Sequence, residues 1–497
     1  MYLGIDIGTT ATKAILIDAS QSIVASRSIT YPTSQPAPGL AEQDPHAWIH
    51  AVSAALRQLY GDAPATYAAV GRIGLSGQMH SLVALDAASR PVRPAMLWND
   101  TRGEAECRTL MRLVPDVAAI SGAAAMPSFT AAKLMWVRAH EPETFARIHQ
   151  VLLPKDYVRL RLTGELATDM SDAGGSQLFD QRRRAWSEPI VAAIGLAPNR
   201  LPPILEGPDV AGRLRREAAA ALGLPPGIPV VAGGADAGTG AIGIGCVDDG
   251  HSFISLGTGA TFVVVKASYE SAHGGFLHDF AHCIPNRWYR MAAMLNGASC
   301  ISWAARLVGA ADIGELLAKV EERFAGPSRV IFLPYLSGER TPHNNAAVRG
   351  AFVGLDASVD ATDAAQAVLE GVAFSLKDAL LALGSTGQDI RNPGFIGGGS
   401  RSLLWSRIIA SVLGRPILRY EGADLGPALG AARLAMLSEP GATLHAVAQA
   451  PKIATTVEPV PDLAERYAER HADYQAFYPA LAALRARGPV AGHVGHL

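Results

Sequence analysis

The sequence predicts an α/β protein of two related domains, and three observations support this fold class. A pattern of strand, glycine turn and strand occurs twice, once as GIDIGTTATKAILI at residues 4–17 and once as SFISLGTGATFVVV at residues 252–265. The first half continues in the order strand, strand, strand, helix, strand, which is typical of a mixed sheet with helices on its faces. At 497 residues, the chain is also too long for one ordinary hydrophobic core.

The N-terminal segments predict a three-stranded meander over residues 1–30, followed by a helix. YLGIDIG, TKAILID and SIVASRSITY have the composition of strands. The helix is expected after Asp44, because Pro45 suits a first helical turn and HAWIHAVSAALRQL has apolar residues at helical spacing. VGRIGLSG is the next expected strand. Residues 100–225 predict an insertion of helices, including one over TRGEAECRTLMRLV and one over TAAKLMWVRAHEPETFARI.

The second half predicts a further meander, two long helices and a helical end. The two helices are expected over SCISWAARLVG and DATDAAQAVLEGVAFSLKDALLALG. PGFIGGGS predicts a strand that enters a glycine turn, with Ser400 starting a helix, and PILRY predicts another strand. GPALGAARLAML predicts a helix of small residues. We therefore expect domains at residues 1–243 and 244–440, and a helical tail at 441–497 packed on the second domain.

Composition and charge exclude several classes of function. The formal net charge is −2 and the one basic run is the triplet Arg182–Arg184, so nucleic acid is not an expected partner. The four cysteines lack metal-binding spacing and are expected to be reduced thiols of a cytosolic protein. The N-terminus shows no signal-peptide pattern and no apolar stretch is long enough to span a bilayer. We therefore expect a cytoplasmic protein without a membrane partner.

The repeated glycine turn has the chemistry of a phosphate loop. Aligned on the glycines, residues 8–12 (GTTAT) correspond to residues 257–261 (GTGAT). A glycine turn with flanking hydroxyls lets backbone N–H groups converge on phosphate oxygens. One such turn alone would more often be a simple hairpin. Two of them in related halves predict a nucleotide held in a cleft between two domains.

The first copy alone carries a carboxylate on its incoming strand, Asp6, and a lysine after the turn, Lys13. A carboxylate beside a triphosphate is repulsive unless a divalent cation lies between them. Mg²⁺ typically keeps several waters while it contacts one or two carboxylates. Asp6 is therefore a candidate ligand of Mg²⁺ through water, and the alternative is an aspartate that caps the turn.

Asp236, in the segment GGADAGTGAIGIG at residues 233–245, is the candidate catalytic base. It lies where a predicted strand gives way to a helix of small residues. We expect the helix dipole to keep its carboxylate ionised, which suits a group that accepts a proton from a hydroxyl. In phosphoryl transfer the transition state is loose, so such a base mainly orients the nucleophile. The alternative role for Asp236 is that of a helix N-cap.

Three further loops are candidates for substrate binding. The glycines of FIGGGSRS, residues 395–402, would let the backbone pass close to an adenine or ribose, or would form a simple turn; neither GxGxxG nor GxxxxGK[ST] occurs. Two other loops offer fixed donors, acceptors and an apolar wall to a hydroxyl-rich substrate. They carry Gln78, Met79 and His80, and Trp98, Asn99, Asp100 and Arg102. His80 has the alternative role of a structural histidine.

A set of longer motifs resembles the xylulokinases of the FGGY carbohydrate kinase family. The likeness covers roughly residues 1–480 in order and rests on YLGIDIGTTATK, GLSGQMH, MLWNDTR, SFTAAKLMWVRAHEPE, LLPKDYVRLRLTGELATDMSDAGG, VVAGGADAGTGAIGIG, FLPYLSGERTPHNN, VLEGVAF, IGGGSRS and DLGPALGAARLA. It implies two ribonuclease-H-like (actin/hexokinase-like ATPase) domains that close over ATP and a ketopentose. It also implies ATP-dependent phosphorylation of D-xylulose on O5, with Mg²⁺ as the metal.

The resemblance also implies roles for residues that match the motifs. The first domain would bind the sugar and carry the first phosphate loop, and the second would bind the nucleotide. Asp236 would be the catalytic base and Asp6 the Mg²⁺-linked carboxylate. The sugar would contact Gln78, Met79, His80, Trp98, Asn99, Asp100 and Asp236. The phosphates would lie on Gly8, Thr9, Thr10, Lys13, Gly257, Thr258 and Gly259, and the nucleoside near Gly398, Gly399 and Ser400.

Three residues depart from the family pattern. Ala237 stands where many relatives have Asn, Gly259 where Ser is frequent, and Ala139 where a more polar residue is usual. Ala237 leaves open another ketopentose, a pentitol or a deoxy-xylulose as the substrate. A non-catalytic sugar or nucleotide sensor is the alternative of another class, which the presence of both Asp6 and Asp236 disfavours. The helix-rich surface and the family likeness suggest a homodimer.

Overall fold

The computed structural model describes residues 1–37, 39–271, 277–384, 389–421 and 426–486, and the chain divides into two compact units. Unit 1 comprises Met1–Asp249, Val265–Arg290 and Leu425–Pro451, and unit 2 comprises Gly250–Val264, Met291–Asp424 and Lys452–Leu497. In the described part of the chain, no helix is both long and apolar enough to cross a membrane. The predicted division at residues 243 and 440, with a tail at 441–497, stays a prediction; residues 487–497 of that tail lie outside the described residues.

The sheet of unit 1 contains the predicted N-terminal meander, which the structure confirms. Its strand order is β13-β14-β5-β1-β2-β3, with β15 also paired to β5. Strand β1 is antiparallel to β2 and parallel to β5, so β1 lies in the middle of the sheet. The strands are β1 (Tyr2–Ile7), β2 (Ala11–Ile17), β3 (Ile23–Thr30), β5 (Arg72–Gly77), β13 (Val210–Arg213), β14 (Pro229–Val231) and β15 (Gly234–Ala235).

Helix α1 (Pro45–Asp62) begins where the sequence predicts and covers one face of this sheet. The side chain of Asp44 caps it by accepting a hydrogen bond from the N–H of His46 at 2.9 Å. Trp48, on the buried side of the helix, is 0% exposed and belongs to one core with Leu3 and Ile5 of β1. Burial of this apolar side fixes the orientation of the meander.

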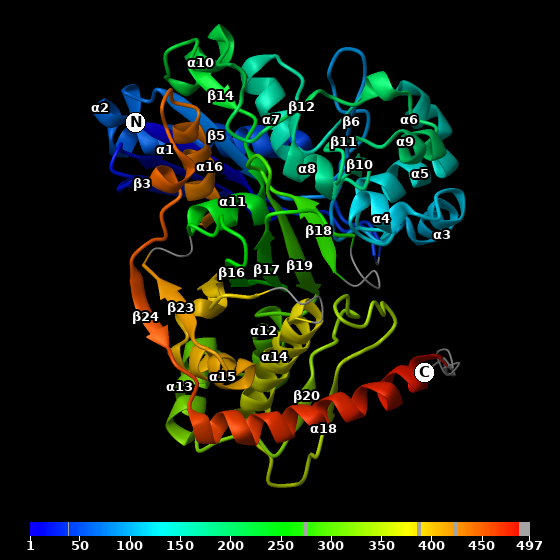
Figure 1. Ribbon diagram of the computed structural model, residues 1–497, viewed down its shortest axis with the longest axis vertical. Coiled ribbons are helices and arrows are strands. Elements are labelled where there is room, and N and C mark those ends of the chain that lie inside the picture. The colour runs from blue at the N-terminus through cyan, green and yellow to red at the C-terminus, as the bar shows by residue number, and fades with distance from the viewer. Residues whose placement is uncertain (38, 272–276, 385–388, 422–425, 487–497) are drawn as a thin grey trace, which may run out of the picture. The chain divides into compact units, whose positions relative to one another are not determined.

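Helices α16 (Gly426–Leu437) and α11 (Asp236–Gly243) pack on the other face of the sheet through small residues. A Cβ atom on Gly4 of β1 would overlap the backbone of α16 at Ala428, and one on Gly74 of β5 would overlap it at Ala431. A Cβ on Gly430 of α16 would overlap the carbonyl of Thr239 in α11. The two helices therefore lie in direct contact (Figure 1), and the predicted helix of small residues is confirmed.

Several helices between residues 100 and 225 share a core of their own, which includes Leu110, Leu134 and Ile190. The helix at Pro154–Thr163 instead contributes Tyr157 and Val158 to the core of the first sheet. The single helix predicted over residues 130–148 is wrong, because it is broken into α5 (Thr130–His140) and α6 (Pro142–Arg147). Pro142 has no N–H to donate and disfavours a helical conformation at Glu141. The neighbouring helices are α3 (Glu104–Leu113), α7 (Pro154–Thr163), α8 (Met170–Gly175) and α9 (Glu188–Ile194).

The second seven-stranded sheet repeats the connectivity of the first. Its order is β18-β19-β17-β16-β22-β23-β24. Strand β16 is antiparallel to β17 and parallel to β22, as β1 is to β2 and β5. The predicted repeat is therefore confirmed in topology. The strands are β16 (Ser252–Leu256), β17 (Ala260–Lys266), β18 (His278–Ala281), β19 (Trp288–Met294), β22 (Gly394–Ile396), β23 (Ile417–Tyr420) and β24 (Ile453–Val457).

Five long helices build most of unit 2. Helices α12, α14 and the polar C-terminal helix α18 were predicted, whereas α13 was not. Helix α18 packs against α14, α15 and strand β20 (Ile331–Leu333). The helix after the glycine turn starts at Leu403, capped by Ser402, and not at Ser400, whose hydroxyl donates to the Gly397 carbonyl instead. The helices are α12 (Ser299–Leu307), α13 (Ile313–Arg323), α14 (Ala361–Gly384), α15 (Leu403–Leu413) and α18 (Pro461–Ala486).

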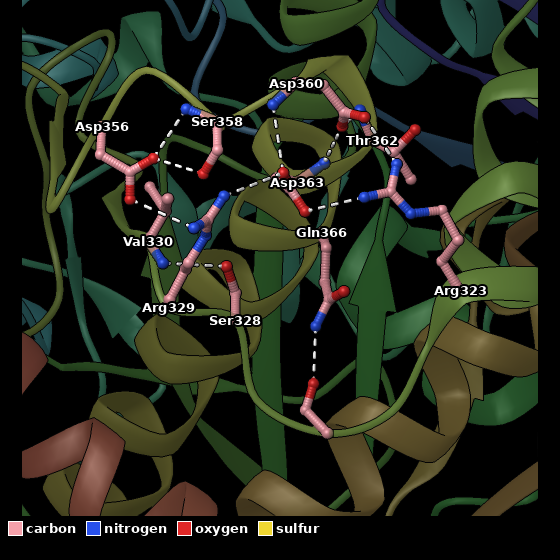
Figure 2. A network of polar contacts seen from close by, with 11 residues as sticks. Arg323, Ser328, Arg329, Val330, Asp356, Ser358, Asp360, Thr362, Asp363 and Gln366 are labelled. Atoms are coloured by element: carbon pink, nitrogen blue, oxygen red, sulfur yellow. Dashed lines mark hydrogen bonds and ion pairs between the residues drawn. The ribbon is translucent and has the colours of Figure 1, made fainter.

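A polar network holds the start of helix α14 (Figure 2). One carboxylate oxygen of Asp360 accepts from the N–H groups of Thr362 and Asp363, and Asp363 accepts in return from the N–H of Asp360 at 3.1 Å. Arg323 and Arg329 both form ion pairs with Asp363. Exposed ion pairs contribute at most about 1 kcal/mol each, so the network mainly sets where the helix begins.

We expect Gly430→Ala to destabilise the protein, because the added methyl group must displace the backbone of α11. Overpacking of this kind costs about 1–3 kcal/mol, which corresponds to a fall of roughly 2–12 °C in the midpoint of thermal unfolding. Gly240→Ala in α11 is the matched control, since the nearest atom to its new Cβ is 3.9 Å away. A helical Gly→Ala change without a clash is neutral or stabilising. Equal midpoints for the two variants would contradict the close packing.

Candidate active site

Asp6 lies near the carboxyl end of β1, two residues beyond the glycine on which α16 packs. It is opposite Lys13 of β2 and Ser76 of β5, so the three side chains share one face of the sheet. Burial raises the pKa of the Asp6 carboxyl, against the opposing effects of a hydrogen bond from Ser76 and the charge of Lys13. Its Oδ1 atom is buried and has no hydrogen-bond partner in the described part of the chain. A carboxylate oxygen is therefore left for a ligand.

Asp236 is the first residue of α11, and neighbouring contacts fix it beside Asp6. Strand β15, immediately before it, pairs with the end of β5 at Ser76. The hydroxyls of Ser76 and Thr239 of α11 are 2.7 Å apart. The N-cap of α11 is Ala235, and Asp236 accepts from the N–H of Ala237 at 2.8 Å. The alternative role as an N-cap therefore does not apply.

The expectation that the helix dipole keeps Asp236 ionised is wrong. Burial, and to a smaller extent the charge of Asp6, together raise the pKa of this carboxyl to about 7. The hydrogen bond from the N–H of Ala237 opposes the shift but does not cancel it. Desolvation outweighs the favourable field of a short helix here. A carboxyl with a pKa near 7 can accept and release a proton at neutral pH.

A buried charged cluster supports the strand that leads to Asp236. The hydroxyl of Ser171 accepts from the N–H of Ala235 at 2.9 Å and donates to Asp169. Lys155 forms ion pairs with Asp169 at 2.8 Å and with Asp172 at 3.0 Å, and all three side chains are 0% exposed. Sequence reasoning missed these residues, although they lie in the quoted motif LLPKDYVRLRLTGELATDMSDAGG. No spacing in the sequence connects them to residue 235.

In the first glycine turn, which the sequence predicts to be a phosphate loop, the carbonyl groups of residues 8–10 all accept hydrogen bonds from the protein. The Tyr31 hydroxyl donates to Gly8 O at 2.5 Å, the Gln43 side chain donates to Thr9 O at 2.6 Å, and the Tyr31 N–H donates to Thr10 O at 3.1 Å. The N–H groups of Thr9 and Thr10 donate to no residue among those described. Adjacent unpaired amides at a turn form an anion-binding concavity.

The predicted loop at residues 78–80 is buried, and several groups hold its backbone. His80 has a left-handed φ of +68°, which is uncommon for a residue with a side chain. Its carbonyl accepts from the Thr130 hydroxyl at 3.0 Å and from the Lys133 ammonium at 2.9 Å. Its ring Nδ1 lies 2.5 Å from the carbonyl of Gly175. The His80 ring is therefore anchored in the way expected of a structural histidine. Gln78 and Met79 precede it in the same loop.

In the second predicted loop, residues 98–102, some polar side chains hold the loop in place and another is available to a ligand. The Trp98 indole N–H donates to the Thr9 hydroxyl at 2.9 Å, which ties this loop to the phosphate loop. The Asp100 carboxylate accepts from the N–H of Ala41 at 2.8 Å and forms an ion pair with Arg102 at 2.6 Å. Asn99 Oδ1, in contrast, is buried without a partner in the described residues. Asn99 is thus the polar group that this loop leaves for a ligand.

The second phosphate loop, in unit 2, is one residue shorter than the first. Leu256 pairs with Ala260 and leaves residues 257–259 in the turn, whereas Ile7 pairs with Thr12 and leaves residues 8–11. The predicted alignment of residues 8–12 with residues 257–261 is therefore wrong by one residue after the turn, because Thr12 corresponds in pairing to Ala260 and not to Thr261. A Cβ on Gly259 would lie 2.7 Å from the carbonyl of Met294, so this turn leaves no room for a side chain at that position.

The glycine turn at residues 397–400 also belongs to unit 2. Gly397 has φ +86°, and a Cβ on it would lie 2.7 Å from the carbonyl of Leu256, so glycine is required there. A Cβ on Gly398 would meet no atom within 4 Å, which leaves its backbone open to a ligand. The predicted contact of Gly398, Gly399 and Ser400 with a nucleoside stays a prediction.

Comparisons with known proteins agree with this arrangement. Residues 1–243 match the N-terminal domain of the FGGY family of carbohydrate kinases, and residues 252–439 match its C-terminal domain. The chain is 42% identical to the xylulose kinase of Escherichia coli K12 over 96% of each chain. It is 44% identical to the xylulose kinase of Klebsiella pneumoniae over 88% of this chain and 89% of that one. A crystal structure of a "xyloylose kinase" from Brucella ovis superposes with a TM-score of 0.92 at 43% identity, covering 97% of this chain and 99% of that chain.

The chain therefore belongs to the FGGY family of carbohydrate kinases. The predicted fold class, α/β with two ribonuclease-H-like (actin/hexokinase-like) domains, is confirmed. The protein is a carbohydrate kinase, as the resemblance implied, and a kinase of this family uses ATP.

We expect Lys133→Met to weaken sugar binding, because it removes the charged donor that holds the His80 carbonyl. Hydrogen bonds from charged groups contribute about 1.5–3 kcal/mol, so KM for the sugar should rise roughly 10- to 100-fold with a smaller change in KM for ATP. Lys452→Met changes an exposed lysine of unit 2, with a side chain 79% exposed, and serves as the control. Steady-state kinetics with each substrate varied make the measurement. An unchanged KM for the sugar in folded Lys133→Met would contradict the anchoring role.

Proposed function

We propose that this protein phosphorylates D-xylulose with ATP to give D-xylulose 5-phosphate and ADP. The relatives named xylulose kinase support this substrate, because the similarity extends over nearly the whole of both chains. The observation that carries the chemistry is the Asp236 carboxyl, whose pKa of about 7 suits a base at neutral pH. The chain carries a candidate group for each step: Asp236 to activate the hydroxyl, and residues 8–10, Lys13 and residues 257–259 to bind phosphate.

In the proposed reaction Asp236 is the general base. The terminal hydroxyl of the sugar donates a hydrogen bond to its carboxylate, which orients the oxygen toward the γ-phosphorus of ATP. As the new O–P bond forms, the bond between the γ-phosphorus and the β,γ-bridging oxygen breaks, and ADP leaves with that electron pair. The hydroxyl proton passes to Asp236 late, because the transition state is loose. Solvent then takes the proton from the carboxyl.

Asp6 is the proposed contact to Mg²⁺. Its buried Oδ1 has no partner among the described residues, which fits a metal-bound water or the metal itself. In the described part of the chain, no group of three or more metal-ligating side chains gathers. That fits Mg²⁺, which binds through one or two carboxylates, waters and substrate phosphates. When bound, the ion would neutralise negative charge on the phosphate oxygens.

The other residues are proposed to bind the two substrates. Asn99 would accept from a sugar hydroxyl, and Gln78, Met79, His80 and Trp98 would shape the sugar site. We assign Asp100 to ordering its loop, since its carboxylate is occupied by Ala41 and Arg102. The phosphates would lie on residues 8–10, Lys13 and residues 257–259, and the nucleoside near residues 398–400.

A cytoplasmic location and a homodimer complete the proposal. All four cysteines are free and buried, as expected in a reducing compartment that also supplies ATP. The homodimer rests on the helix-rich surface and the family likeness. Light scattering on the purified protein would measure the mass in solution, and a monomer at 52.0 kDa would reject the dimer.

Ala237 favours a second candidate, a kinase of a related polyol. It follows the catalytic Asp236 directly and offers no polar group to the sugar, so the preference among pentoses depends on other residues. The remaining candidates are another ketopentose, a pentitol or a deoxy-xylulose. A sensor without catalysis is disfavoured by the base and the metal-binding carboxylate together.

A panel of sugars tests the proposed substrate. With ATP and Mg²⁺, ADP release should be fastest with D-xylulose, by roughly 10-fold or more in kcat/KM over D-ribulose, L-xylulose, xylitol and 1-deoxy-D-xylulose. A polyol that exceeds D-xylulose would replace it as the substrate. ADP release that does not depend on any sugar would reject the kinase.

The pKa of Asp236 predicts the pH dependence. Only the ionised carboxylate can accept the proton, so kcat/KM for the sugar should rise with pH through about 7 and should be roughly tenfold lower at pH 6 than on the plateau. Asp236→Asn should lower turnover by at least about 100-fold while sugar binding, measured by calorimetry, survives. A flat profile from pH 5.5 to 8, or an active Asp236→Asn variant, would exclude Asp236 as the base.

A further inference from the structure

The motif FLPYLSGERTPHNN, residues 332–345, has no part in the function described so far. It leaves strand β20 and returns to β21 (Ala351–Val353), and within it Glu339 is only 1% exposed. We propose that Glu339 is a positioning residue for the nucleotide, acting through the phosphate loop at residues 257–259. This inference rests on the proposed role of that loop in binding phosphate. All the residues involved belong to unit 2.

The Glu339 carboxylate holds the end of strand β19. Its Oε1 accepts from the N–H of Leu295 at 2.7 Å and from the N–H of Arg340 at 2.8 Å. Its Oε2 accepts from the side-chain amide of Asn296 at 3.1 Å. Leu295 and Asn296 directly follow β19, so the carboxylate determines where the chain goes as it leaves that strand.

Asn296 and Thr341 complete the same attachment. The Asn296 amide donates to the carbonyl of Gly338 at 2.7 Å, and its Oδ1 accepts from the N–H of Ser337 at 3.2 Å. Thr341 exchanges hydrogen bonds with Ala293, through its N–H and its hydroxyl, each at 3.1 Å. Residues 337–341 therefore clamp residues 293–296 from several directions, with Glu339 at the centre.

The next residues in the chain hold the phosphate loop itself. The N–H of Gly297 donates to Thr258 O at 3.0 Å, and the N–H of Ala298 donates to Gly257 O at 2.7 Å. The hydroxyl of Ser299 also donates to Thr258 O, at 2.7 Å. The two segments touch, because a Cβ on Gly297 would overlap the carbonyl of Gly259.

The carbonyl groups of residues 257–259 in unit 2 thus accept hydrogen bonds from the protein, as those of residues 8–10 in unit 1 do, but the donors are different. Tyr31 and Gln43 bond the carbonyls of residues 8–10 in unit 1. In unit 2, the backbone of residues 297 and 298 takes this role, and the Gly257 N–H itself bonds the third carbonyl, Gly259 O, at 3.0 Å. The position of residues 297–299 depends on the clamp at Leu295 and Asn296. Glu339 therefore acts on the nucleotide from outside the loop.

A carboxylate suits this position better than a neutral group does. It accepts three N–H donors at once, and hydrogen bonds to an ionised acceptor are stronger than those between neutral groups. Burial nevertheless raises the pKa of Glu339, to about 7. A glutamine of the same shape would present an NH₂ group to the amide of Asn296 and leave a buried donor without an acceptor.

Glu370 of α14 offers a matched control. It is also 1% exposed, and burial raises its pKa to about 7 as well. Its carboxylate accepts from the N–H of Ser328 at 3.0 Å, the Gln366 amide at 2.9 Å and the Tyr467 hydroxyl at 3.0 Å. Two of these partners, Ser328 and Gln366, belong to the network of Figure 2, and all three lie outside residues 257–259 and 293–299. Glu370→Gln should cost stability without a specific effect on the nucleotide.

The experiment compares Glu339→Gln with Glu370→Gln in the full-length protein. Calorimetric titration with MgADP and, separately, with D-xylulose gives the two dissociation constants, and thermal unfolding gives the stability. We expect Glu339→Gln to raise Kd for MgADP roughly 5- to 100-fold, with Kd for the sugar within about twofold of the wild type. Glu370→Gln should change neither dissociation constant, even if its midpoint of thermal unfolding falls as far as that of Glu339→Gln.

Each outcome decides the inference. An unchanged Kd for MgADP in Glu339→Gln, or equal weakening in both variants, would overturn it while leaving the proposed function intact. A wild-type protein that does not bind MgADP would overturn the proposed function and this inference together. If Glu339→Gln does not fold, Asn296→Ala removes the same attachment from its other side. It should show the same loss of nucleotide binding, and a wild-type Kd for MgADP in that variant would overturn the inference.

Discussion

The close contact of α16 with strands β1 and β5 and with helix α11 is the constraint on which the site depends. Gly4, Gly74 and Gly430 are each placed where a Cβ would overlap a neighbouring backbone. Interiors of this density leave no room for a methyl group without displacement. The contact keeps α11 against the sheet, and its first residue, Asp236, then lies beside Asp6. The chemistry of unit 1 thus follows from packing between backbones.

That packing also explains the unusual acid–base property of the site. Asp6 and Asp236 approach each other where water is largely excluded, so both carboxyls have raised pKa values. The short helix α11 cannot compensate, because its field acts on a group that has lost most of its hydration. The carboxyl that we propose as the base therefore titrates near neutral pH because it is buried beside a second carboxylate. A cation bound near Asp6 would offset its negative charge and so lower the pKa of Asp236.

The two glycine turns that we propose to bind phosphate have the same arrangement of their carbonyl groups, held by two different sets of contacts. In each turn the carbonyls accept hydrogen bonds from the protein, which would leave backbone amides for an anion. Unit 1 uses the side chains of Tyr31 and Gln43, whereas unit 2 uses the backbone after β19 and a shorter turn. Duplicated halves can therefore keep the same strand order while the residues that support each loop diverge.

Much of the fold followed from local patterns, and much of the site did not. The meander, the start of α1 after Asp44, the small-residue helix α16 and the position of Asp236 at the start of a helix were all predicted, because each depends on neighbouring residues. The break at Pro142 and the cap at Ser402 were local signals that were missed. The pKa of Asp236, the support from Ser171 and the clamp by Glu339 depend on residues distant in sequence, which spacing alone cannot connect.

A direct titration of the Asp236 side chain tests the central claim most sharply. Carboxyl-¹³C NMR of aspartate-labelled protein, with the signal assigned by its loss in Asp236→Asn, reports the protonation of this group without reference to turnover. The account predicts a midpoint near pH 7 in the protein without ligands. A midpoint near 4, the ordinary value for an exposed aspartate, would show that the carboxyl is well hydrated and would contradict the account.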